Sequence, residues 1–306
     1  MLGRLVSVLL SVLVVWMGYA LSREVFPEHP YIALVVGLLM GVIPGYINTM
    51  SSIYDGVGAV AVVTAVLLLC TRIIRHGPAP VSVALLLALS AVGLGVKSSA
   101  WIAIPLGLWA GIDILWPRTT VRQRSLGLLL LSSSVLVGLR WAPDAAQIRL
   151  PAEALSLMRL FAERTGASLR PGHWPVYAEA IGYQFRTFWV PLNGESSLLP
   201  PVFILGYMGF SMLLVGGGAV RIFGGLDLNS LAPCQKRLMA FFVFATTLSL
   251  VLSIARIEVV GGELWYAPAG RHLYITIAPI LILLLAGLSR VTRLVRRNDR
   301  PLTRTG

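Results

Sequence analysis

Residues 57–75 read VGAVAVVTAVLLLCTRIIR, and after HGP at 76–78 a second apolar run, APVSVALLLALSAVGLGV, fills residues 79–96. Each run approaches the roughly 20 residues that a helix needs to cross about 30 Å of hydrocarbon. The charged residues of the first run, Arg72 and Arg75, stand at its end. The pair therefore predicts two membrane-spanning helices joined by a short polar turn, and an all-α fold.

The composition of the whole chain agrees with this prediction. Of its 306 residues, 57% are hydrophobic and 12% are charged, about half of the roughly 25% usual in soluble domains. The net charge of +12 could indicate a nucleic-acid partner. However, the basic residues cluster in short segments between apolar runs, where they act as topology signals, so no nucleic-acid partner is expected. Cys70 and Cys234 form neither a disulfide framework nor a metal framework.

Nine apolar runs predict a polytopic bundle of about nine spans. Their approximate ranges are 4–21, 31–50, 57–75, 79–96, 98–116, 125–141, 200–219, 238–255 and 272–289. The weakest boundary separates the fourth run from the fifth, where only Lys97-Ser98-Ser99 interrupts the apolar residues. If those two runs merged, the count would fall to eight.

The positive-inside rule orients the predicted bundle. With the C-terminus inside, fifteen Arg and Lys residues fall in inner segments and four in short outer segments. This places the chain in a bacterial cytoplasmic (inner) membrane with a cytoplasmic C-terminus, and nine spans then put the N-terminus outside. Arg4 is discordant with that orientation, and residues 1–20 also resemble a signal peptide, with a basic start and Gly18-Tyr19-Ala20 before Leu21.

Four parts are expected along the chain: an N-terminal membrane bundle of six spans (1–141), an outer loop of about 58 residues (142–199), a C-terminal membrane bundle of three spans (200–289) and a basic cytoplasmic tail (290–306). Pro151 opens an amphipathic helix in the loop. That helix either lies in the membrane interface or packs on the loop's own small core. The tail would hold the C-terminus at anionic inner-leaflet lipid.

Charged residues lie at the ends of several apolar runs, on the predicted outer face. They are Asp55 before the third span, Lys97 between the fourth and fifth, and Arg271 with His272 before the ninth. Charges near membrane depth are costly and often functional, although each one alone could be a snorkelling or capping residue. Asp113, near the inner end of the fifth span, is expected to pair structurally with Arg118.

The motifs of several soluble enzyme classes are missing from the sequence. It contains no Walker A loop, no His/Cys metal spacing, no nucleophile elbow and no Rossmann glycine run. The glycine cluster at 216–218 lies inside a span, where close helix packing accounts for it.

Four local motifs resemble those of the GT-C superfamily of membrane glycosyltransferases, especially bacterial predicted membrane proteins related to aminoarabinose and protein-mannosyl transferases. The first is Pro44 followed eleven residues later by Asp55. The others are 95–105, GVKSSAWIAIP, with Lys97 and Pro105; Thr187-Phe188-Trp189 with Gly194 and Leu199-Pro200; and 270–274, GRHLY, with Pro279. Their order and spacing agree with the family over about 40–290.

One departure from the family accompanies the resemblance. Such enzymes begin with a cytoplasmic N-terminus, a first span and an outer loop bearing an acidic motif, and this chain opens at what resembles the second span. The missing part would explain the outside N-terminus. The expectation is a truncated product, one half of a split protein whose missing part a separate chain supplies, or a degenerate relative.

The resemblance implies sugar transfer from a polyprenyl-phosphate donor at the outer membrane face. Asp55, the secondary acid in the family pattern, is the best remaining candidate to orient or deprotonate the acceptor. Lys97 and Arg271 would bind the lipid phosphate, and His272 would either assist them or simply sit at the interface. Trp174, Trp189, Tyr266 and Tyr274 would border the acceptor and lipid cleft. No cofactor is predicted, although the chemistry would allow a divalent metal. The expected partners are membrane lipid and the polyprenyl-phosphate-linked sugar. The alternative is a non-catalytic protein, either a lipid or polysaccharide transporter or a subunit of a complex.

Overall fold

The protein is seen in a computed structural model that describes residues 2–52, 56–115, 184, 187–189, 232–259 and 270–286. These residues are helical, with short turns between the helices, and no strand occurs among them. The predicted spans at 125–141 and 200–219, most of the loop 142–199 and the tail 290–306 lie outside the described residues. The all-α prediction is confirmed for the part that the structure describes.

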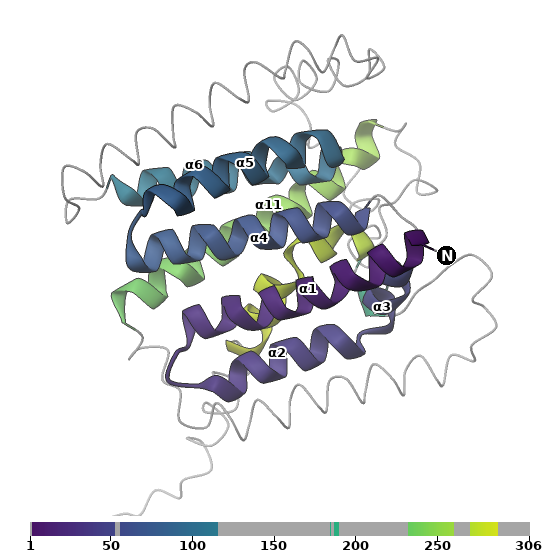
Figure 1. Cartoon of the computed structure of the whole chain (residues 1–306), viewed down its shortest axis with the longest axis horizontal. Helices are drawn as coiled ribbons and strands as arrows, with labels where there is room; N and C mark the ends of the chain where they lie inside the picture. Colours follow the sequence, from purple (N-terminus) through teal and green to yellow (C-terminus); the bar gives the residue numbers. More distant parts are fainter. Residues whose placement is uncertain are drawn as a thin grey trace, which may run out of the picture.

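In chain order, the described elements are all helices. They are α1 (Leu2–Val25), α2 (Pro30–Val42), α3 (Pro44–Ser51), α4 (Gly56–His76), α5 (Pro80–Val96), the 3-10 helix η1 (Ser98–Ile102), α6 (Ala103–Ile114), α11 (Pro233–Val259) and the 3-10 helix η6 (Gly270–Thr276), which continues as an α-helix over 277–286. In Figure 1, α4 lies between α1 and the α5–α6 pair, and α2 lies on the far side of α1.

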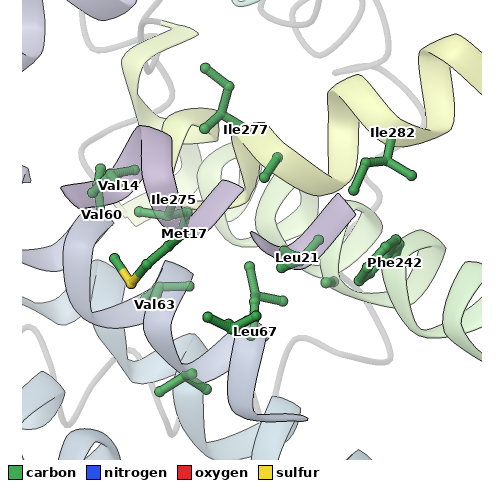
Figure 2. Packing of buried hydrophobic residues seen from close by; sticks show 14 of the residues in the cluster. Val14, Met17, Leu21, Val60, Val63, Leu67, Phe242, Ile275, Ile277 and Ile282 are labelled. Carbon is green, nitrogen blue, oxygen red and sulfur yellow. The ribbon is translucent and has the colours of Figure 1, made fainter. Parts of the chain in front are cut away.

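α4 is the central helix of this arrangement. It contacts α1, α5, α6, α11 and η6, and 78% of its most apolar window is buried, against 33% for α1 and for α11. A helix that is apolar all round suits such a position, because every face meets another helix. Side chains of α1, α4, α11 and the 270–286 segment interdigitate in one core (Figure 2). Helices from both predicted membrane bundles thus contribute to the same core.

α1 has a core face and an exterior face, and both are apolar. Val14, Met17 and Leu21 recur at helical spacing and are buried, whereas a second stripe, which includes Leu9, Val12 and Trp16, is exposed. Exposed apolar stripes on a helix of this length are typical of lipid contact. α1 packs on both α2 and α4, so its buried face is part of the bundle core, and its length and apolarity fit the span predicted at 4–21.

Among the described residues, three helices, at 3–25, 56–76 and 233–253, are long and apolar enough to cross a membrane, and a fourth span is reached if α2 and α3 count as one. The weak boundary at Lys97 is a true break: α5 ends at Val96, Lys97 is extended, and η1 and α6 follow as a separate unit. The fourth and fifth apolar runs therefore do not merge into one helix. The helices over 80–96 and 99–114 are shorter than the three long helices, as is the helix over 271–286.

The predicted span over 31–50 is not one straight helix, because α2 and α3 meet at a bend of 65°. Pro44 has no N–H to donate to the preceding turn, and its ring disfavours helical geometry at the residue before it. Ile43 accordingly takes an extended conformation, with φ −70° and ψ 113°. The bend carries α3 across the end of the bundle, where it contacts α1 and η6.

Candidate functional site

Three short elements, α3, η1 and η6, form one end of the bundle, here called the α3 end. α3 contacts η6, and η6 contacts η1. The N-terminus of α1 lies at the same end (Figure 1). Each element belongs to one of the motifs quoted above. A break in the helix at Ile43–Pro44 precedes α3, and another at Lys97 precedes η1. η6 is itself a 3-10 helix.

A buried aromatic cluster joins these elements. Tyr46 of α3 meets Tyr274 of η6 edge to face, with ring centroids 5.6 Å apart, and Phe188 lies 5.2 Å from both Tyr274 and Trp189. Such edge-to-face pairs are favourable because the positive ring edge faces the negative face of its neighbour. The Tyr274 hydroxyl donates a hydrogen bond of 2.7 Å to the Phe188 carbonyl oxygen. Residues far apart in the sequence are thereby fixed to one another.

A polar contact extends the cluster towards α11. The Gln184 side-chain amide donates to the Ser253 hydroxyl at 2.9 Å, and that hydroxyl donates to the Leu250 carbonyl at 2.8 Å. Both Gln184 and Ser253 are buried. The segment around 184–189 therefore rests on α11 as well as on η6.

Lys97 and Arg271 both lie at the α3 end, Lys97 just before η1 and Arg271 on the first turn of η6. Arg271 is exposed, and Lys97 and His272 are half-buried. The contact between η1 and η6 brings the two cationic segments side by side. Cationic groups that converge at the end of an apolar bundle provide charge complementary to an anionic headgroup.

The other predicted site residues divide into two groups. Trp189 and Tyr274 are 5% and 0% exposed, so both pack inside the aromatic cluster. Asp55, Trp174 and Tyr266 lie outside the described residues. The chain on either side of Asp55, at Ser52 and Gly56, belongs to the ends of α3 and α4.

Sequence reasoning missed Gly45 and Tyr46, which bring α3 into the aromatic cluster. A side chain at Gly45 would overlap the Tyr274 hydroxyl oxygen and come within 2.9 Å of the Phe188 carbonyl oxygen. The Tyr46 hydroxyl is buried and has no hydrogen-bond partner among the described residues. The only local signal was a small residue directly after Pro44.

The opposite end of the bundle, here called the Glu24 end, is basic but internally paired. The Glu24 carboxylate contacts Arg72 at 3.0 Å, His76 at 2.9 Å and Arg75 at 3.4 Å. Asp113 is paired as expected, but its partner is Arg237 of α11, at 2.9 Å, and Arg118 lies outside the described residues. Long-range packing of α6 on α11 supplies a partner that sequence proximity could not reveal.

The architecture defines a class, that of α-helical membrane proteins whose apolar helices are capped by two polar ends. Within the described part of the chain, no group of three or more His, Cys, Asp or Glu side chains gathers to hold a metal ion. No protein-family model matches the sequence, and neither the curated proteins nor the solved structures contain a significant match.

Proposed function

We propose that the protein is a membrane glycosyltransferase of the GT-C type, which transfers a sugar from a polyprenyl-phosphate donor at the α3 end. One observation carries the proposal. Segments of all four motifs that resemble the family meet at that end: α3 after Pro44, η1 after Lys97, residues 187–189 and η6. Spacing in the sequence alone does not require four such segments to converge, so their convergence supports a shared site.

The proposed chemistry assigns a role to each charged residue of the site. When the glycosidic bond to the donor breaks, the lipid phosphate leaves as an anion, and nearby cations stabilise that developing charge. Arg271 offers a planar fork suited to two phosphate oxygens, and Lys97 adds a point charge. His272 assists them. Asp55 orients or deprotonates the acceptor hydroxyl.

We further propose the topology in which this chemistry faces outward. The chain crosses a bacterial inner membrane nine times, with its C-terminus in the cytoplasm and residues 142–199 outside. The charge count in the sequence supports this orientation, because fifteen basic residues fall in inner segments and four in short outer segments. The α3 end would then be the outer end.

The first test measures binding of a short-chain polyprenyl phosphate to the full chain in lipid nanodiscs. Lys97→Ala and Arg271→Ala should each weaken binding by about tenfold or more, because each removes a charge-assisted contact worth roughly 1.5–3 kcal/mol. Arg271→Lys should restore part of the affinity, since it keeps the charge but loses the fork. Lys236→Ala is the matched control, as Lys236 is exposed at the Glu24 end. Wild-type affinity in both alanine variants would contradict the assignment.

Asp55→Asn separates catalysis from binding. The asparagine keeps the size of the side chain but cannot accept a proton, so polyprenyl-phosphate binding should persist while sugar transfer falls by about 100-fold or more. The measurement follows transfer of a labelled sugar from a polyprenyl-phosphate donor in membranes that contain the variant. Undiminished transfer would exclude Asp55 as the acid or base. A wild-type chain that binds no lipid phosphate would instead favour a non-catalytic membrane protein.

A further inference from the structure

Gly45 is the point at which three distant segments of the chain touch. The Tyr274 hydroxyl lies directly against it, and the carbonyl oxygens of Phe188 and Thr187 would stand 2.9 and 3.2 Å from a Cβ built at this position. The Tyr274 hydroxyl simultaneously donates to the Phe188 carbonyl. The absence of a side chain at residue 45 is therefore what lets this hydrogen bond form against the backbone of α3.

The neighbours of Gly45 could not easily yield to a side chain. Tyr274 is fully buried and its ring is fixed by Tyr46 on one side and Phe188 on another. The two carbonyl oxygens belong to the backbone. Closely packed interiors tolerate an extra methyl group only when a flexible side-chain end can move aside, and that condition is not met here.

Tyr274 is connected to the proposed phosphate site through the geometry of η6. In a 3-10 helix the side chains at i and i+3 are eclipsed, and the rise is about 2.0 Å per residue. Arg271 and Tyr274 are three residues apart in η6, so Arg271 stands one turn, roughly 6 Å, above the buried phenol on the same face. Holding Tyr274 in place therefore also holds the part of the η6 backbone from which Arg271 projects.

We propose that Gly45 and Tyr274 are positioning residues. Their contact, closed by the hydrogen bond to the Phe188 carbonyl, locks η6 against α3 and residues 187–189 and so places Arg271 beside the Lys97 segment. This contact is called the lock below. Its role in binding phosphate rests on the proposed function, but its existence can be tested without any ligand. Neither residue touches the phosphate; both act through Arg271.

Hydrogen exchange of the full chain in nanodiscs tests the lock itself. Gly45→Ala should raise exchange of the amides in 270–276 by about tenfold or more, because the methyl group displaces the Tyr274 hydroxyl. Tyr274→Phe should have a smaller effect, since the ring and its aromatic contacts remain. The double variant Gly45→Ala/Tyr274→Phe should recover part of the protection, because removing the hydroxyl relieves the shortest contact of the methyl group and leaves only the two carbonyl oxygens beside it.

Two internal controls make these results specific to the lock. Gly41→Ala introduces the same methyl group one turn before α3, at a position with no atom within 4 Å, and should leave exchange unchanged. The amides of α4 should exchange alike in all variants, which shows that the bundle stays folded. Unchanged protection of 270–276 in Gly45→Ala would overturn the proposal, as would equal loss in the single Gly45→Ala and the double variant.

Binding of short-chain polyprenyl phosphate by the same variants tests what the lock is for. Affinity should fall in Gly45→Ala by about tenfold, the loss expected for one misplaced charge-assisted contact, and should return in part in the double variant. Wild-type affinity in a Gly45→Ala chain whose 270–276 amides have lost protection would overturn the positioning role. If wild type binds no polyprenyl phosphate while the exchange pattern holds, the proposed function fails and the lock stands.

Discussion

At the scale of single residues, Glu24 ties together the ends of two helices. It stands one residue before the end of α1, and its three basic partners come from the last turns of α4. Arg75 also donates to the backbone carbonyls of Arg23 and Glu24. Basic side chains near these carbonyls complement the negative end of the α1 dipole, so charge and backbone contacts act in the same direction.

Replacing Glu24 by Gln should therefore destabilise the protein. The Glu24 and Arg75 side chains are only 17% and 25% exposed, so their pair is less screened than the pair with Arg72, which is 47% exposed and contributes little. The loss should be about 1–3 kcal/mol, the usual cost of leaving a partly buried polar group unpaired. Thermal unfolding in detergent measures it. The exposed Glu28→Gln is the matched control, and equal midpoints for both variants would contradict the expectation.

The sequence predicts residues whose role follows from their own position and not those whose role depends on a distant partner. Lys97 and Arg271 stand out because each interrupts or precedes an apolar run. Glu24 and Gly45 do not stand out, because Arg72 lies 48 residues from Glu24 and Gly45 is explained only by Tyr274. A single sequence does not show which distant residues are in contact.

At the scale of elements, apolar runs predict where helices lie better than where they bend. The run 57–75 becomes α4 with one residue added at each end, and 79–96 differs from α5 by one residue. The run 31–50 is divided into two helices because the apolar residues continue through Pro44, whereas regular helical geometry cannot. The ninth run likewise begins as 3-10 helix and becomes α-helical only at 277.

Pro44→Ala should reduce the bend between α2 and α3, since it restores the missing N–H and relieves Ile43. Spin labels at Tyr31 and Ser51, both exposed, report the change. With a rise of 1.5 Å per residue, straightening the 65° bend would lengthen their separation by about 4 Å. An unchanged distance would mean that the contacts of Gly45 and Tyr46, and not the proline, set the angle.

At the scale of the whole molecule, the two polar ends differ in how many basic residues they hold. Among the described residues, the Glu24 end holds Arg23, Arg72, Arg75, Lys236 and Arg237, of which Arg72, Arg75 and Arg237 are paired with acids. The α3 end presents Arg4, Lys97 and Arg271. By the positive-inside rule, this difference favours the proposed orientation, in which the more basic Glu24 end faces the cytoplasm.

Single-cysteine labelling tests this orientation in intact cells. In a chain with Cys70 and Cys234 replaced, a cysteine at Glu28 in the turn between α1 and α2 should resist a membrane-impermeant maleimide, whereas one at Ser52 should react. Both positions are exposed, so accessibility depends on the side of the membrane. Permeabilised cells, in which both should react, provide the control. The reverse pattern would move the α3 end to the cytoplasm and exclude transfer at the outer face.

The central position of α4 has a consequence for how the protein is made. Cys234 at the start of α11 comes to lie against Ile74 of α4, 160 residues earlier in the chain. At about 5–20 residues per second, a ribosome needs roughly 8–32 s to synthesise that interval. During this time the surface of α4 that α11 later covers must face lipid or an insertion factor. The apolar side chains of that surface therefore contact lipid or the insertion factor first, and they pack against α11 only in the finished bundle.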